Sequence, residues 1–500
     1  MAAGTALVIP FPKEIPYQGT MLVGALLVAA LIAEGNSPVL CLTVLGWMLV
    51  TNFGFNIVGG FRNPAGAYIL FVTLFTGLLG VFVKALTNEP LVANVPNADQ
   101  TLLVYMLGTC ATTFAALLSL RFRPKKPFLA GRLTQGNTNN VVIGCLVVGI
   151  GLPYALYLLA PGLASIARQL NITLPLAILI GVFQRVKATG GRSSFSWPVL
   201  IAWAFSTWVG LLSYSKEAMF APSLAWVVAS AAARLRLSIL QVITLVPLGA
   251  FAVLILVPYS QYGRNFRDET AANPQVAYNL LRHPLALRDK VNRDAAERID
   301  LYHWYNQPRG IFDRLTLVPI DSALIALTDL QGPIGLQNTF NYFENIIPHF
   351  ILPDKPEIRA GNDYAHEIGM LAPSDHTTGI SFSPFGDAYH QAGWLGILLV
   401  MPAIQFLMFV AMNYVLGSTE EAPWALFFVM AFAHIAAEGM LSFPVYIISF
   451  GMEAVVATAF AMIYLTPMIG SLLLGPGRNA IPERSFAQPA RTRFAAEARG

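Results

Sequence analysis

The amino-acid sequence predicts an all-α polytopic membrane protein with about twelve transmembrane helices and one large loop region. Three observations lead to this fold class. Hydrophobic residues make up 55% of the 500 residues and charged residues only 12%, about half the charged fraction of soluble domains. Apolar windows recur, each covering roughly the 20 residues that a helix needs to cross a ~30 Å hydrocarbon layer. The basic residues gather in alternate connections between these windows.

The apolar windows define the expected membrane helices. In chain order they are 17–33, 38–58, 66–86, 101–120, 139–160, 163–184, 196–214, 217–233, 238–258, 390–413, 423–439 and 445–470. All three cysteines fall inside these windows, so neither a disulfide framework nor a zinc site is indicated.

Four basic connections fall on one side of the membrane when the helices are counted in this order. Their residues are Arg62; Arg121, Arg123, Lys125, Lys126 and Arg132; Arg185, Lys187 and Arg192; and Arg234 and Arg236. Because Lys and Arg are retained in cytoplasmic loops, this side is predicted to be cytoplasmic. Both termini then lie in the cytoplasm, and acidic or neutral connections such as "TNEPLVANVPNADQ" (87–100) lie outside it.

The chain is expected to divide into four regions. An N-terminal membrane region over 1–258 holds about nine helices, and a C-terminal membrane region over 390–470 holds about three. Between them, 259–389 lacks a membrane-length apolar run and is predicted to form a mostly helical periplasmic domain. Within it, "DSALIALTDL" (321–330) is predicted to lie on the membrane surface. The tail over 471–500 is predicted to be disordered and cytoplasmic.

Most of the histidines and many of the cations lie in or beside this loop region. Six of the seven histidines fall between 283 and 390, and eleven of the 31 Lys and Arg fall between 264 and 359. Ordinary loop polarity explains many of them. The histidines lack H-x-x-x-H or H-x-H spacing and no D-x-D pair occurs, so we expect no metal and no cofactor. For a subset, an anion-binding surface of Arg and Lys is favoured.

The interiors of the predicted helices are almost free of charge. Lys216, Glu217, His434 and Glu438 all fall near the extracytoplasmic ends of helices. A proton- or ion-coupled transporter would instead place ionisable side chains near the bilayer midplane. The pattern indicates an enzyme that acts on a lipid-borne substrate at one membrane face.

Motifs in a particular order lead to a family resemblance. "LLSYSKEAMFAP" (211–222) and "RGIFDRLTLV" (309–318) precede "IIPHFILPDKP" (346–356), which is followed by "FGDAYHQAGWLG" (385–396) at the start of a membrane helix. Together they resemble the signature region of the Wzy-type O-antigen and exopolysaccharide polymerases. The family's late, large periplasmic loop and its ten to fourteen or so helices also fit this chain.

The chain departs from the family pattern at several motif positions. His349 stands where the family often has Arg, Asp387 where it has Glu, and Gln391 where it has Asn. Tyr389 and the glycines at 393 and 396 are kept. These departures bear on the roles of single residues more than on the family.

The resemblance implies a glycosyl transfer between lipid-linked substrates at the periplasmic face of the bacterial inner membrane. The donor is an undecaprenyl-pyrophosphate-linked glycan, and the terminal hydroxyl of another lipid-linked repeat unit replaces the pyrophosphate at its anomeric carbon. Cations would stabilise the leaving pyrophosphate, and a base would accept the hydroxyl proton. Membrane lipid and a chain-length regulator are candidate partners, and no nucleic acid is expected.

Candidate cations for the pyrophosphate lie in the motifs and beside them. They are Lys216, Arg309 and Arg314, with Lys355 and Arg359 next. Each has a structural alternative. Arg309 and Arg314 can pair with Asp313 or with other loop acids, and Lys216 can extend to the membrane interface or pair with Glu217.

The candidate catalytic residues are Asp387, His390 and His349, and His376 and Tyr389 are candidate substrate-binding residues. The sequence places Ser383 and Pro384 at the N-cap and first turn of a helix, which puts Asp387 and His390 one turn apart on one face. In the structural alternative, Asp387 is a first-turn acid that complements the helix dipole. Tyr389 can likewise belong to an interfacial aromatic belt.

The leading functional prediction is therefore a repeat-unit polymerase. The nearest alternative is an O-antigen ligase, which uses the same donor with a lipid A-core acceptor. A lipid-glycan flippase or other transporter is the third, and it would need a charged central cavity that the apolar helix interiors do not indicate.

Overall fold

The computed structural model describes residues 7–131, 133, 138–159, 170–263, 274–297, 303–307, 309, 312–313, 315–347, 351–352, 354–356, 358–376, 378–438 and 442–475. Within these ranges the chain is helical almost throughout. The strands found there form one two-stranded sheet, in which β1 (Leu7–Val8) pairs antiparallel with β2 (Arg236–Leu237). The predicted all-α class is confirmed.

Long apolar helices joined by short connections make up the first half of the chain. They are α1 (Tyr17–Ala33), α2 (Pro38–Ile57), α3 (Pro64–Thr73), α4 (Leu79–Thr87), α5 (Ala98–Ser119), α6 (Thr138–Leu159), α8 (Thr173–Ala188), α9 (Trp197–Leu212), α10 (Lys216–Ala233), α11 (Ile239–Phe251) and α12 (Val257–Gly263). The π-helical segments Leu74–Leu78 and Ala252–Leu256 join α3 to α4 and α11 to α12.

Shorter helices follow in the loop region, and long ones return at the end. The loop helices are α13 (Pro274–Arg282), α14 (Pro284–Glu297), α15 (Val318–Gln331), α16 (Gln337–Ile346) and α17 (Ala360–Glu367). The C-terminal helices are α18 (Pro384–Leu395), α19 (Met401–Val415), α20 (Leu426–Glu438), α21 (Ala454–Phe460) and α22 (Thr466–Leu474), with π-helical segments at Gly396–Val400, Val445–Glu453 and Ala461–Leu465.

Capping residues explain where several helices begin. A side-chain oxygen at the N-cap followed by proline starts α2 at Ser37, α3 at Asn63 and α18 at Ser383. The side chain accepts an otherwise unpaired N–H of the first turn, and proline fits this turn because it lacks an N–H. A capping residue also explains where α4 ends: its C-cap, Asn88, adopts a left-handed conformation with φ 57°.

Eight helical runs among the described residues are long and apolar enough to cross a membrane. They are Pro38–Ile57, Pro64–Thr87, Ala98–Phe122, Thr138–Leu156, Leu170–Ala188, Ile239–Gly263, Pro384–Val415 and Val445–Leu474. Shorter apolar helices occur at Tyr17–Ala33, Trp197–Leu212 and Pro423–Ala437. The multi-pass membrane class is confirmed, while the count of twelve spans stays a prediction.

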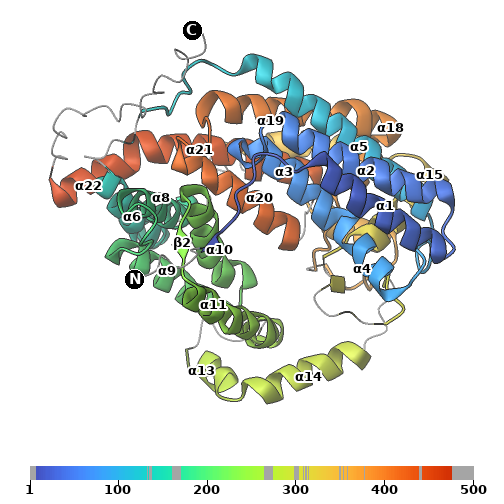
Figure 1. Cartoon of the computed structure of the whole chain (residues 1–500), viewed down its shortest axis with the longest axis horizontal. Coiled ribbons are helices and arrows are strands. Elements are labelled where there is room, and N and C mark those ends of the chain that lie inside the picture. The colour runs from blue at the N-terminus through green and yellow to red at the C-terminus, as the bar shows by residue number, and fades with distance from the viewer. Residues whose placement is uncertain are drawn as a thin grey trace, which may run out of the picture.

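The C-terminal helices pack against both the first and the middle helices of the chain, and α20 lies between these two groups (Figure 1). α20 packs against both α3 and α10, α19 packs against α5, and α22 packs against α6. One continuous core results, and it includes Val318 and Ile325 of the loop helix α15. The loop region over 259–389 thus shares part of its core with the membrane helices, while the predicted division into regions stays a prediction.

The N-terminal segment crosses the end of the molecule where the basic connections lie. β1 pairs with β2, which follows α10, and the Phe61 N–H after α2 donates to the Pro12 carbonyl at 3.1 Å. Glu420, in the connection after α19, pairs with Lys13 at 2.6 Å and with Arg62 at 2.6 Å. These connections therefore share one end, as the helix count predicts. The assignment of that end to the cytoplasm stays a prediction.

The loop region packs at the opposite end. The Leu91 N–H, in the connection after α4, donates to the Asn36 side chain at 2.7 Å. The Asn97 N–H in the same connection donates to the Ser322 hydroxyl of α15 at 2.9 Å. The predicted extracytoplasmic connections and the loop helix α15 therefore meet.

Two predicted helix boundaries in the first half of the chain are wrong. The helix expected over 163–184 begins at Thr173 and continues to Ala188, because Arg185 and Lys187 in its last turn complement the negative end of the helix dipole. The run expected to end at 258 continues to Gly263. The π-helical segment ends at Leu256, two residues before Pro258, so the regular hydrogen-bond pattern is already altered close to the residue that lacks a donor.

Three further boundary or placement predictions need correction. The span expected from 390 begins at Pro384, where the capping residues place it, and the last helix continues past 470 to Leu474. Most of the segment 321–330 does not lie on a surface, because Asp321, Leu324 and Ile325 on α15 are fully buried; its last residues, Asp329 and Leu330, are exposed. The predicted tail beyond 475 lies outside the described residues.

Candidate functional site

The candidate site is built around the first turns of α18. Ser383 caps this helix by accepting a hydrogen bond from the Gly386 N–H at 2.9 Å, and Pro384 occupies the first turn. The predicted start of the helix is confirmed. The helix breaks at Gly393, whose φ of 57° and ψ of −140° favour glycine. Gly393 therefore allows a backbone conformation that other residues rarely adopt.

The connection between α15 and α16 closes this break. The Ile334 N–H donates to the His390 carbonyl at 3.1 Å, and the Gly335 N–H donates to the Gln391 carbonyl at 2.9 Å. Carbonyls in the last turn of a helix need donors from elsewhere. The loop thus binds the backbone of two motif residues directly.

Asp387 is fully buried and holds α18 to its neighbours. Its Oδ1 accepts from Gln391 Nε2 at 2.9 Å, and its Oδ2 accepts from the Phe443 N–H, just before the last membrane span, at 2.8 Å. Both oxygens are therefore engaged with protein donors. The geometry favours a structural acid, and the predicted catalytic role stays untested.

A second buried acid, Asp321 on α15, was not among the predicted residues. Its Oδ2 accepts from the Tyr105 hydroxyl at 2.7 Å, and its Oδ1 accepts from the Ser383 N–H at 3.1 Å. Gly386 lies directly against this carboxylate, and a Cβ there would overlap it. Burial raises the pKa of Asp321 to about 6, although the bonds from Ser383 and Tyr105 oppose the shift. The signal in the sequence was an acid inside an apolar helical segment.

His390 is 1% exposed and is bonded through both ring nitrogens. Nδ1 lies 2.8 Å from the Thr328 hydroxyl, and Nε2 lies 3.0 Å from Glu367 Oε2. The Thr328 hydroxyl lies 2.7 Å from the Leu324 carbonyl, to which it donates. It then accepts from Nδ1–H, so the contact between Nε2 and Glu367 needs a second hydrogen, carried by the ring nitrogen or by the carboxyl group. The ring of Tyr364 packs edge-on against the imidazole.

Glu367 connects the buried histidine to the surface. It ends α17, and 39% of its side chain is exposed, compared with 2% for His390. One of its carboxyl oxygens contacts the imidazole, and the side chain is partly open to solvent. A carboxyl group in this position can accept a proton from a bound molecule or donate one to it. Glu367 was not predicted, because nothing in its local sequence places it beside His390.

Tyr389, a predicted substrate-binding residue, is held between helices. Its hydroxyl donates to Asp329 Oδ1 at 2.7 Å and accepts from Gln100 Nε2 at 3.0 Å. Trp394 packs edge-on against its ring, with centroids 5.4 Å apart. The Tyr389 hydroxyl therefore links α18 to α15 and α5, which favours a structural role.

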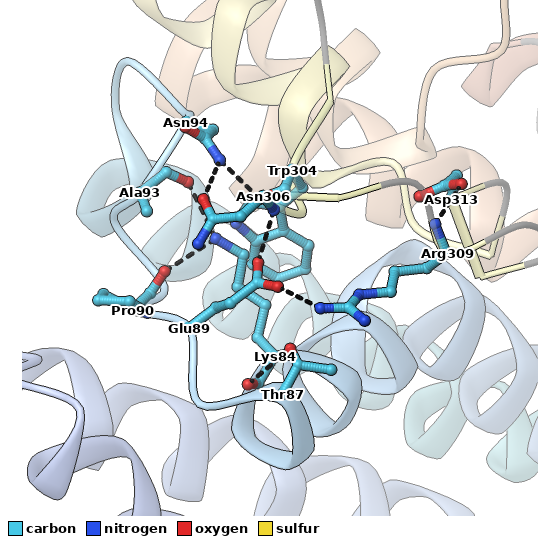
Figure 2. Close-up of polar contacts among 10 residues, drawn as sticks. All are labelled: Lys84, Thr87, Glu89, Pro90, Ala93, Asn94, Trp304, Asn306, Arg309 and Asp313. Atoms are coloured by element: carbon cyan, nitrogen blue, oxygen red, sulfur yellow. Dashed lines mark hydrogen bonds and ion pairs between the residues drawn. The ribbon is translucent and has the colours of Figure 1, made fainter. Parts of the chain in front are cut away.

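Arg309, a predicted pyrophosphate ligand, is paired with an acid in the connection after α4 (Figure 2). Its Nη2 lies 2.8 Å from Glu89 Oε1, and its backbone N–H donates to Asp313 at 2.9 Å. Burial would raise the pKa of Glu89, but the bonds from Arg309 and from the Asn306 N–H lower it overall. The structural alternative, pairing with a loop acid, is thus observed, with Glu89 as the partner.

The same connection is stabilised by a buried lysine (Figure 2). Lys84 Nζ donates to the carbonyls of Pro90 at 2.8 Å and Ala93 at 3.0 Å, and it lies 5.0 Å from the ring centroid of Trp304. The Trp304 indole N–H donates to the Leu91 carbonyl at 3.0 Å. The end of α4 and the chain at 304–309 therefore form one bonded unit.

The remaining predicted cations lie on several elements. Lys216 is buried at the first turn of α10, and Arg359 is the N-cap residue of α17. Lys355 Nζ donates to the Asn345 carbonyl, near the C-terminal end of α16, at 2.9 Å. His376 lies beside His366, with ring centroids 6.1 Å apart.

Two predicted residues, His349 and Arg314, lie outside the described residues. Across the ranges that are described, no group of three His, Cys, Asp or Glu is arranged to hold a metal ion. No protein-family model, no curated protein and no solved structure matches the chain. The site is therefore interpreted from its own residues.

Proposed function

We propose that this protein is a membrane glycosyltransferase that polymerises undecaprenyl-pyrophosphate-linked repeat units at the periplasmic face of the bacterial inner membrane. The observation that carries the proposal is the Glu367–His390 pair at the loop-side end of a broken membrane helix. A lipid-linked sugar would meet the protein at such a place, because its lipid stays in the bilayer. The sequence motifs around the pair support the same substrate class.

In the proposed reaction, Glu367 accepts the proton of the acceptor hydroxyl. The hydroxyl oxygen bonds to the donor's anomeric carbon while the bond from that carbon to the pyrophosphate oxygen breaks, and the electron pair leaves with the pyrophosphate. A positioned base contributes about 10²–10⁴ to the rate of such a step. His390 holds Glu367 through the Nε2–Oε2 hydrogen bond, and the two buried acids Asp387 and Asp321 hold α18 in place.

The leaving pyrophosphate needs cations from the predicted set. Lys216, Lys355 and Arg359 keep this role in the proposal, together with Arg314. Arg309 is the least suitable, because the charge of Glu89 offsets its own at 2.8 Å.

Deletion of the gene tests the proposal against its alternatives. A polymerase mutant carries surface glycan that stops at one repeat unit. A ligase mutant accumulates polymer on the carrier lipid, and a flippase mutant accumulates single lipid-linked units on the cytoplasmic side. Either of the last two results would contradict the proposal.

A further inference from the structure

We propose that α16 is an interfacial helix that inserts an apolar stripe into the lipid on the loop side of the membrane. The stripe consists of Phe340, Phe343 and Ile347, which are 58%, 38% and 40% exposed. Exposed apolar side chains at this spacing line one face of a helix and its continuation. The proposal does not depend on the proposed function.

α16 presents three different faces. The first faces the protein: Thr339 is buried and donates to Gln391 at 2.6 Å, and Tyr342, three residues on, packs against the core. The second is the apolar stripe. The third is polar and includes Glu344, which is exposed. A helix lying at a membrane surface beside a protein needs one face for protein, one for lipid and one for water.

The position of α16 puts this stripe at membrane level. α16 packs against Val445–Glu453, the first part of a membrane span, where Phe450 is 37% exposed. Thr339 bonds to Gln391, and Leu395, only four residues further along that span, is 57% exposed. In a membrane protein, such exposed apolar side chains on spans face lipid. α16 therefore packs against two spans that carry exposed, lipid-facing apolar side chains near the contact.

The segments on either side of α16 share its character. Leu330, Ile334 and Ile351 are 83%, 47% and 61% exposed. Large apolar side chains gathered in this way on the surface mark a contact with membrane or protein. Lys355, bonded to the Asn345 carbonyl at the end of α16, places an ammonium group at the edge of the stripe, where lysines commonly meet lipid headgroups.

Lipid is the occupant that these observations favour over a second protein. The helix that carries the stripe packs against two spans with lipid-facing side chains, and its polar face carries the exposed Glu344. The buried face of α16 contacts α18 and the last span, so insertion would fix the depth of the loop relative to these helices.

Depth-dependent quenching tests the proposal on the full chain. Cys41, Cys110 and Cys145 are first replaced by alanine, and single cysteines are then placed at Phe343, Ile347 and, as the matched control, Glu344. Each variant is labelled with a fluorescent maleimide in phosphatidylcholine nanodiscs containing 5-doxyl or 12-doxyl phosphatidylcholine. Iodide serves as the aqueous quencher.

We expect the labels at 343 and 347 to be quenched more by 5-doxyl than by 12-doxyl lipid and to lose most iodide quenching. The label at 344 should instead be quenched strongly by iodide and only weakly by either doxyl lipid. Equal iodide quenching at 343 and 344 would overturn the proposal, as would protection of 343 from both lipid and iodide, which indicates a protein interface. The label at 347 decides the outcome if the Phe343 variant does not fold.

Discussion

His390 Nε2 lies 3.0 Å from Glu367 Oε2, so a buried imidazole lies within hydrogen-bond distance of a carboxyl group that reaches the surface. The two residues are separated by 23 positions and belong to different helices, α17 and α18. The Thr328 hydroxyl on α15 fixes the other ring nitrogen at 2.8 Å. Three helices thus place one acid–base pair at the loop-side end of a membrane span.

The buried Asp321 gives a prediction about pH. Its pKa is raised from 3.8 to about 6 by burial, so the folded protein keeps this proton where the unfolded chain has released it. The carboxyl group therefore contributes less to the free energy of unfolding as the pH rises from 3.8 to about 6, by on the order of 3 kcal/mol. Above this range its contribution is constant.

Asp321→Asn should remove this dependence. Thermal melts of the wild-type protein and the variant in detergent, taken at several pH values, give the comparison. The difference in Tm between wild type and variant should shrink as pH rises from about 4 to about 6. A difference that is constant over that range would show that the carboxyl does not titrate there.

The Gly386–Asp321 contact gives a prediction about packing. A methyl group at 386 would overlap the Asp321 carboxylate, so Gly386→Ala should destabilise the protein by about 1–3 kcal/mol. Gly249→Ala is the matched control, because the position lies in α11, also a membrane helix, with no atom within 4 Å of the added Cβ. Equal Tm values for the two variants would refute the close contact.

The Glu89–Arg309 pair gives a prediction about coupling. Removing Arg309 leaves Glu89, which is 3% exposed, as a buried acid without its main partner. Arg309→Ala should therefore cost about 1–3 kcal/mol of stability, and much less in a Glu89→Gln background. The four proteins of this double-mutant cycle are compared by thermal unfolding. Additive effects would mean that the pair does not act as a unit.

The arrangement of loops gives a prediction about topology. In a chain without native cysteines, a cysteine at the exposed position Asp354 should react with a membrane-impermeant thiol reagent in whole cells, and one at exposed Lys125 should not. The two positions lie in the loop region and in a basic connection. Reaction of Lys125→Cys alone would reverse the predicted orientation.

The sequence predicted local features well. Apolar length is enough to find most helices, and the Ser383–Pro384 pair places the start of α18 because capping depends on adjacent residues. Boundaries failed where other local effects compete, as at Thr173, where the apolar run starts earlier than the helix. The helix count also predicted correctly that the basic connections lie at the same end of the molecule.

Contacts between distant segments could not be predicted. Asp321 meets Tyr105 and Ser383, residues more than sixty positions away on either side, and Glu367 meets His390 across the connection between α17 and α18. The apolar pattern of 321–330 fits a surface helix and a buried helix equally well. Which of the two forms depends on the helices that pack against it. For Arg309, the sequence suggested a loop acid as a partner but could not identify Glu89.

The most direct test of the account is Glu367→Gln, assayed in cells that lack the chromosomal gene. The variant keeps the size of the side chain and can still bond to His390, but it cannot accept the acceptor's proton. Glu344→Gln, at another exposed acid of the loop region, is the matched control. We predict that the Glu367 variant inserts at normal levels and leaves surface glycan at one repeat unit, while the control makes full-length polymer. Full-length polymer from a well-expressed Glu367→Gln protein would contradict the central claim.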